Sequence, residues 1–246
     1  MIDPGTGGLS LSDEEKRLLD KTPDADRETR LQALLDTYEP AQNANTSAFT
    51  TEQNNEYALQ HARTALEIAG LLLDLDRKAD AWQYARPAIE ILVAQHAFED
   101  AALACQYTYL SDQDDAIAAI GQAAWLSVTY PVDPHLTANI LAHIIDETPD
   151  DSDGGAVAAA VAHYVVDLRG EGEKKAELRL FTGANLARVA KRHSNVESQM
   201  HFELWVERLE LDVPEKFLVR LRNVIDVMVQ TDWWFDRDAL LANIPD

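Results

Sequence analysis

From Glu56 onward, apolar residues recur at three- and four-residue spacings, interrupted only by short breaks rich in Gly, Pro, Asp and Asn. This spacing is that of an amphipathic helix, and the breaks are typical of caps and turns. No run alternates apolar and polar residues with enough Val, Ile or Thr to predict a strand. The fold class is therefore all-α. We expect helices over residues 55–75, 79–94, 97–110, 112–129, 134–147, 155–169, 174–193, 195–211 and 214–231.

The residues that precede this region have a different character. Ser12, with Glu15 three positions later, predicts the start of a short charged helix, and residues 24–38 predict a second one. Residues 39–55 are rich in Asn, Thr, Ser and Gln without periodicity, which indicates a linker. We therefore expect an N-terminal extension over residues 1–54 and a helical-repeat domain over residues 55–246.

A shift of 35 residues brings small residues of the helical region into register. Five of 27 positions are identical between residues 65–91 and 100–126. The agreeing positions matter more than their number, because small residues recur where the two helices of a hairpin approach closely. The paired alanines are Ala69 with Ala104, Ala81 with Ala116, and Ala88 with Ala123.

This spacing resembles the tetratricopeptide repeat, a helix hairpin of about 34 residues with a small residue late in its first helix and two more in its second. The resemblance is clearest over residues 65–131, where Ile68 precedes Ala69 in one copy and Leu103 precedes Ala104 in the next. The large aromatic residue that the family has early in the first helix is replaced here by Ala65 and Asp100. The repeat is therefore a degenerate one.

The resemblance implies a right-handed α-solenoid of antiparallel helix hairpins with a short N-terminal helical extension. In the family, residues of the first helices line a concave groove that binds peptides or proteins. By register, the groove residues implied here are Arg63, Asp74, Thr108 and Tyr109.

Pro87 stands at the centre of the helix expected over residues 79–94. Proline lacks the amide proton of the intrahelical hydrogen bond and costs a helix interior roughly 3 kcal/mol. Two accounts stay open: the helix bends and so helps superhelical curvature, or a fresh helix begins after a break at Arg86. In the next copy, Gly121 is aligned with Arg86 and also weakens its helix.

The charge of the chain is strongly negative and unevenly distributed. Its 43 acidic and 21 basic residues give a formal net charge of -22. Residues 55–169 hold 18 acids and 5 bases, whereas residues 170–246 hold 14 and 11. Such a surface repels nucleic acids and anionic membranes. Two interpretations remain: an adaptation to a cytoplasm of high salt, with which the 14 Arg against 7 Lys agree, or an acidic surface that attracts a basic partner or imitates DNA.

Composition sets further expectations. No window reaches 18 uninterrupted apolar residues and the first residues do not resemble a signal peptide, so we expect a soluble cytoplasmic protein. The single cysteine, Cys105, excludes an intramolecular disulfide and a thiolate metal cluster. We expect no cofactor.

Two stretches of the sequence contain residues that could bind a metal ion. His193, Glu197 and His201 have the four-residue spacing of ligands on one helix face. However, Ser194 and Glu197 form the pattern of a capping box, which would put His193 before the helix. The acidic turn of residues 146–155 does not have the ligand spacing of an EF-hand calcium loop. No catalytic residue and no metal ligand is predicted.

Two surface features suggest contacts. Trp233 and Trp234, followed by Phe235, either seal the open end of the solenoid or form a contact patch for a partner. The basic face of residues 174–192 is expected to pair with the acidic middle of its own chain or of a second copy.

The function that these observations favour is a non-enzymatic scaffold or adaptor that binds another protein or a peptide, with an acidic surface suited to a basic partner. A regulatory sensor that responds to a ligand or peptide is an alternative, as is an acidic inhibitor that mimics nucleic acid. An all-α enzyme is less favoured. We expect neither nucleic acid nor membrane as a partner, and self-association stays open.

Overall fold

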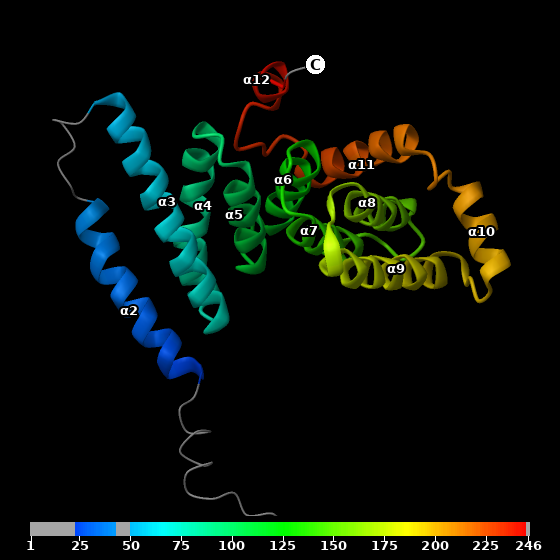
Figure 1. The fold of residues 1–246 in the computed structure, drawn as a ribbon, viewed down its shortest axis with the longest axis horizontal. Helices are drawn as coiled ribbons and strands as arrows, with labels where there is room; N and C mark the ends of the chain where they lie inside the picture. Colours follow the sequence, from blue (N-terminus) through cyan, green and yellow to red (C-terminus); the bar gives the residue numbers. More distant parts are fainter. Residues whose placement is uncertain (1–22, 43–49, 245–246) are drawn as a thin grey trace, which may run out of the picture.

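The computed structural model describes residues 23–42 and 50–244, and all regular structure within them is helical, as the periodicity predicts (Figure 1). The eleven helices of this part of the chain are α2 (Pro23–Gln42), α3 (Thr51–Asp74), α4 (Lys78–Ala94), α5 (Phe98–Leu110), α6 (Ala116–Thr129), α7 (Pro134–Glu147), α8 (Asp153–Arg169), α9 (Gly172–Ser194), α10 (Gln199–Arg208), α11 (Pro214–Val229) and α12 (Arg237–Ala242).

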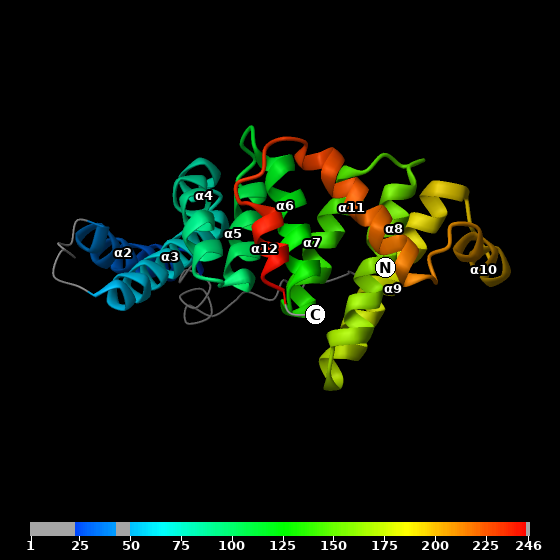
Figure 2. The same cartoon turned by 90° about the horizontal axis from the view of Figure 1, so that it is seen from above.

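The helices from α2 to α9 form a row along the long axis of the molecule (Figures 1 and 2). Consecutive helices of this row pack on each other, and from α3 onward short turns reverse the chain between neighbours. Helix α10 stands at the end of the row opposite α2. Because alternate turns lie on the same side of such a row, the turns after α3, α5 and α7 share one edge.

The turns after α3, α4 and α5 share one backbone geometry. Asp76, His96 and Asp112 each adopt a left-handed conformation, with φ of 57°, 57° and 58°. In the first of them, the amide of Arg77 donates to the carbonyl of Leu72 at 2.8 Å, which is the long bond of a Schellman motif. These turns fix where each helix stops and the next one starts.

Most of the alanines that the 35-residue shift aligns are buried between helices. Ala69, Ala81 and Ala104 have no exposed surface, and Ala88 and Ala123 are also buried. Ala116 is only partly buried. Small side chains at these positions let neighbouring helices approach closely, and the larger Ile89, Leu92 and Ile120 pack in one core cluster with Ala88, Ala104 and Ala123.

Pro87 lies inside a continuous helix, since α4 runs without interruption from Lys78 to Ala94. The account in which a new helix begins after Arg86 is therefore wrong. Pro87 has no amide proton to donate to the carbonyl of Gln83, four residues earlier. Both residues are exposed. Water can solvate that carbonyl, which is why the fold tolerates the proline.

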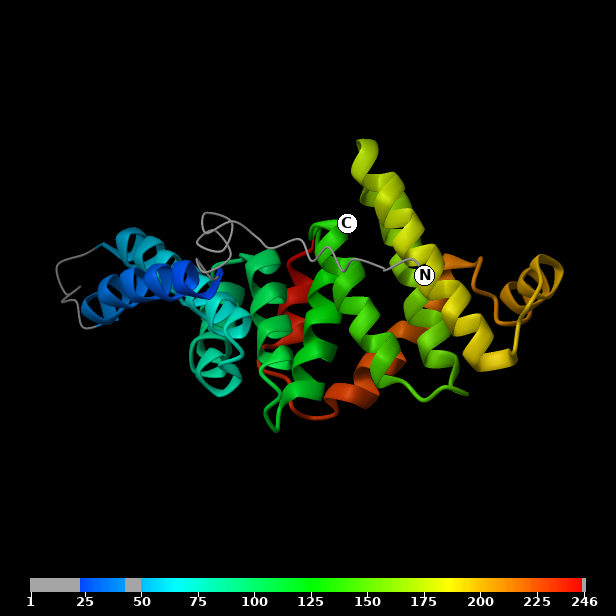
Figure 3. The same cartoon turned by 90° about the horizontal axis from the view of Figure 1, so that it is seen from below.

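The C-terminal part of the chain turns back along the row (Figure 3). Helix α11 packs against both α6 and α8, which are not consecutive in the chain. Gly121 of α6 allows this close approach, because a β-carbon there would stand 2.6 Å from Cγ2 of Val229 in α11. The segment after α11 then crosses α6, where the buried Gln122 donates to the carbonyl of Asp232 at 3.2 Å and accepts from the amide of Trp234 at 2.9 Å.

Several predicted boundaries need correction. The first predicted helix, with Ser12, lies outside the described residues. The linker is shorter than residues 39–55, since α2 reaches Gln42 and Thr50 caps α3 with a capping box. Helix α2 packs on α3 through the buried Leu31 and thus joins the row.

The predicted capping box at Ser194 is wrong. Helix α9 continues through Ser194 and ends at Asn195, which adopts a left-handed conformation with φ of 51°. Ser198 caps α10 instead, and its hydroxyl accepts a hydrogen bond from the amide of His201 at 3.3 Å. His193 therefore lies in the last turn of α9, on a different helix from His201.

Candidate functional site

The turns after α3, α5 and α7 carry a large share of the acidic residues. Of the 18 carboxylates in residues 55–169, 11 lie in or beside these three turns. We call this set the acidic edge. It consists of Asp74, Asp76, Asp80, Asp112, Asp114, Asp115, Asp146, Glu147, Asp150, Asp151 and Asp153.

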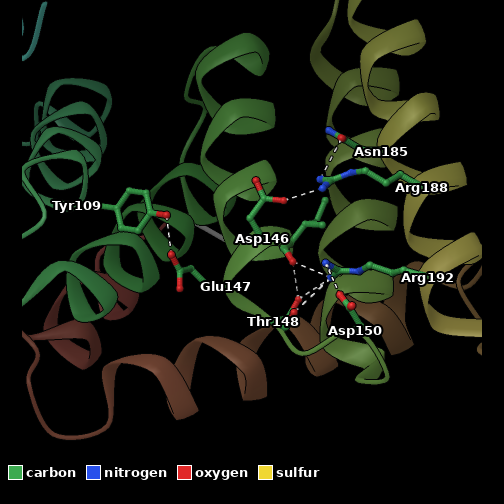
Figure 4. A network of polar contacts seen from close by, with 9 residues as sticks. Tyr109, Asp146, Glu147, Thr148, Asp150, Asn185, Arg188 and Arg192 are labelled. Carbon is green, nitrogen blue, oxygen red and sulfur yellow. Dashed lines mark hydrogen bonds and ion pairs between the residues drawn. The ribbon is translucent and has the colours of Figure 1, made fainter.

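Contacts between turns show that the acidic edge is continuous in space. Lys78, after α3, pairs with Asp112, after α5, at 3.5 Å. The hydroxyl of Tyr109, at the end of α5, donates to Glu147, at the end of α7, at 2.7 Å (Figure 4). Burial and the adjacent Glu147 raise the pKa of Tyr109, so it remains a neutral donor at physiological pH.

Three carboxylates of the acidic edge are left without a partner. Asp76, Asp114 and Asp151 are exposed and make no ion pair or side-chain hydrogen bond within the described part of the chain. Other members are already neutralised, such as Asp74, which pairs with Arg27 at 3.4 Å. The free carboxylates lie one in each of the three turns, so negative charge is distributed along the whole edge.

Basic residues of α9 pair with acids of the same chain. The sequence left open whether they would pair within the chain or with a second copy. Arg188 donates to Asp146 at 2.8 Å, and Arg192 lies 3.4 Å from Asp150 (Figure 4). Arg192 also donates to the carbonyl of Ile145 at 2.7 Å and thereby caps the C-terminus of α7. In the turn after α7, arginines of α9 therefore neutralise part of the acidic edge.

The groove residues implied by the family resemblance divide into two groups. Arg63, Asp74 and Tyr109 reach the surface. Arg63 of α3 pairs with Asp100 of α5 at 2.8 Å and Tyr109 of α5 bonds to Glu147 of α7, whereas Asp74 pairs with Arg27 of α2. Thr108 does not belong with them, because it has no exposed surface and its hydroxyl donates to the carbonyl of Ala104 at 2.9 Å. The prediction that Thr108 lines a contact surface is therefore wrong.

The aromatic cluster does not seal the end of the row. Trp234 lies over Arg86 of α4, with the guanidinium carbon 3.9 Å from a ring centroid, and Trp233 packs edge-on against Trp125 of α6. Both indoles are partly buried in the middle of the molecule. Their role in the fold is to hold the returning C-terminal segment on α4 and α6.

A serine, a histidine and an aspartate that the sequence does not connect meet at the end of α9. The hydroxyl of Ser194 lies 2.7 Å from Nδ1 of His193, and Nε2 of His193 lies 3.0 Å from Asp153, which Arg220 binds at 2.8 Å. Trp205 contacts Nδ1 of His193 at 3.2 Å, and an indole nitrogen can only donate. The histidine proton is therefore on Nε2, directed at Asp153.

This arrangement serves packing better than nucleophilic catalysis. The donor from Trp205 occupies the lone pair that would accept the serine proton. The amides of Asn195 and Val196, which follow the serine, donate to the carbonyls of Lys191 and Ala190 and are not free for an oxyanion. We assign the cluster to joining α8, α9, α10 and α11.

The candidate metal ligands are not brought together. Glu197 accepts a hydrogen bond from Lys191, and this bond together with the lysine charge lowers the pKa of the Glu197 carboxyl. His193 faces Asp153 instead. Within residues 23–42 and 50–244, no group of three His, Cys, Asp or Glu side chains has the arrangement of a metal site. In the same part of the chain, no helix is long and apolar enough to cross a lipid bilayer.

The described residues form an all-helical protein fold with an acidic edge on its surface. No family model, no curated protein and no solved structure matches the chain.

Proposed function

We propose that this chain is a non-enzymatic binding module, a tetratricopeptide-like α-solenoid that holds a basic segment of a partner protein along its acidic edge. The row of antiparallel helices, the buried alanines at the repeat positions and the recurrent turns at Asp76 and Asp112 support the architecture. Tyr109, at the end of α5, would contribute a polar contact beside the edge.

The observation that carries this proposal is the concentration of 11 carboxylates in three neighbouring turns, with Asp76, Asp114 and Asp151 unpaired. A general adaptation to salt requires acidic residues spread over the whole surface. A local excess of carboxylates creates a negative potential that attracts lysine and arginine side chains and speeds association.

The proposal is tested by neutralising charge at two places by the same amount. One variant combines Asp76→Asn, Asp114→Asn and Asp151→Asn. The control variant combines Glu207→Gln, Asp212→Asn and Glu215→Gln, three exposed acids outside the acidic edge. The probe is a lysine- and arginine-rich peptide, whose affinity is measured by titration at about 0.1 M and about 1 M salt.

We expect the edge variant to bind the peptide about tenfold more weakly than the control variant at the lower salt concentration. We expect the difference to shrink at the higher concentration. Equal affinities of the two variants would contradict the proposal, since binding would then follow net charge alone.

A further inference from the structure

The outward face of α9 is unpartnered and carries the most exposed large apolar side chain of the described residues. On its inner face, Leu178, Thr182, Val189 and Ala190 are buried against α7 and α8. On its outer face, Leu180 is 77% exposed. Helix α10 does not cover this face, because it meets α9 only near its end, where Trp205 contacts His193 (Figure 1).

The outer face of α9 has the spacing of a coiled-coil seam. Its residues alternate in steps of four and three positions, and all of them are exposed. That alternation keeps side chains on one side of a helix, where they can meet a second helix. We call this set the outer stripe; in order it consists of Glu173, Glu177, Leu180, Ala184, Ala187 and Lys191.

The outer stripe is complementary to itself when two copies run antiparallel. In the register whose centre lies midway between residues 180 and 184, Leu180 of each copy faces Ala184 of the other. A large side chain then packs against a small one. The same register sets Glu173 opposite Lys191. Parallel pairing would set glutamate against glutamate and lysine against lysine, which repel.

We propose that α9 is the contact between two copies of this chain, joined antiparallel through the outer stripe about a two-fold axis. Every contact then occurs twice, as in an isologous dimer interface. Lys191 also bonds to Asn195 and Glu197 of its own chain, so its ammonium would be shared between these groups and Glu173 of the second copy. The inference goes beyond the proposed function, because the outer stripe contains no residue of the acidic edge.

Sedimentation equilibrium of the full chain over a range of concentrations, at moderate salt, tests the contact. We expect a monomer–dimer equilibrium. Leu180→Lys should raise the dissociation constant of the dimer about a hundredfold, since the change acts twice across the axis. The matched control is Val227→Lys, at a residue of α11 that is 72% exposed, and it should leave the constant unchanged.

Orientation is tested by exchanging charge. Glu173→Lys and Lys191→Glu should each weaken the dimer, and the double variant should restore it. Circular dichroism confirms that each variant is folded. A monomer at every concentration, or a dimer that Leu180→Lys leaves intact, would overturn the proposal. Peptide binding at the acidic edge should survive Leu180→Lys, so failure of this inference is distinguishable from failure of the proposed function.

Discussion

Gly121 of α6 lies directly against Val229 of α11, and a β-carbon at position 121 would stand 2.6 Å from Cγ2 of that valine. The two residues belong to helices that are far apart in the chain. Their contact lets α11 pack against both α6 and α8, which holds the returning C-terminal segment on the row.

Gly121→Ala should therefore destabilise the protein, although alanine favours a helix. Overpacking a tight contact costs about 1–3 kcal/mol, which exceeds the gain of about 1 kcal/mol in helix propensity. Urea unfolding followed by circular dichroism measures the change. The control is Gly183→Ala in α9, where a new β-carbon meets nothing within 4 Å. That variant should be more stable than the native protein, and a similar loss in both variants would contradict the argument.

The helical fold could be predicted from local patterns, because apolar period, caps and small residues act between neighbours in the chain. The position of the aromatic cluster could not. Trp233 and Trp234 suit the end of a row equally well, and only the path of α10 and α11 brings them to α4 and α6. No local signal encodes that path.

The candidate site was predictable in composition but not in geometry. The acidic excess of residues 55–169 is visible in the sequence, whereas its gathering on one edge follows from alternate turns sharing a side of the row. The predicted surface position of Thr108 is wrong because register alone does not show which side of α5 is covered by neighbouring helices. Asn195 was an available signal for the end of α9, since asparagine tolerates the left-handed conformation better than most residues.

Pro87→Ala should stabilise the protein. The substitution restores a hydrogen bond to the carbonyl of Gln83 and removes little packing, because the ring is exposed. The helix gains up to about 3 kcal/mol, and the greater freedom of the unfolded chain offsets about 1 kcal/mol of this. Chemical denaturation should show a higher midpoint. In the control, Pro134→Ala, proline stands in the first turn of α7, where it is well tolerated, so no such gain is expected.

Gln230→Gly should also stabilise the protein. Gln230 has φ of 53° and ψ of -114°. The amide of Asp232 donates to the carbonyl of Val229 at 2.9 Å and closes a four-residue turn that contains Gln230. This is the first central position of a type II′ turn, which favours glycine. Relief of about 1–3 kcal/mol of strain exceeds the entropic cost of glycine, about 1 kcal/mol. Thermal unfolding should show a higher midpoint for Gln230→Gly and a lower one for Thr231→Gly, whose φ is not positive.

His61 should make the stability of the protein depend on pH below about 6.5. Its ring stacks on Tyr38 of α2 at 4.1 Å, and its Nε2 is buried without a hydrogen-bond partner among the described residues. Burial lowers its pKa from the ordinary 6.5, although the backbone of Tyr38 opposes this in part. As the pH falls below 6.5, the unfolded chain binds a proton that the folded chain does not, so stability declines until the folded pKa is reached.

The readout is the difference between urea midpoints at neutral and mildly acidic pH. His61→Gln should reduce that difference, and the exposed His135→Gln should not. An unchanged difference in His61→Gln would show that other groups set the pH response.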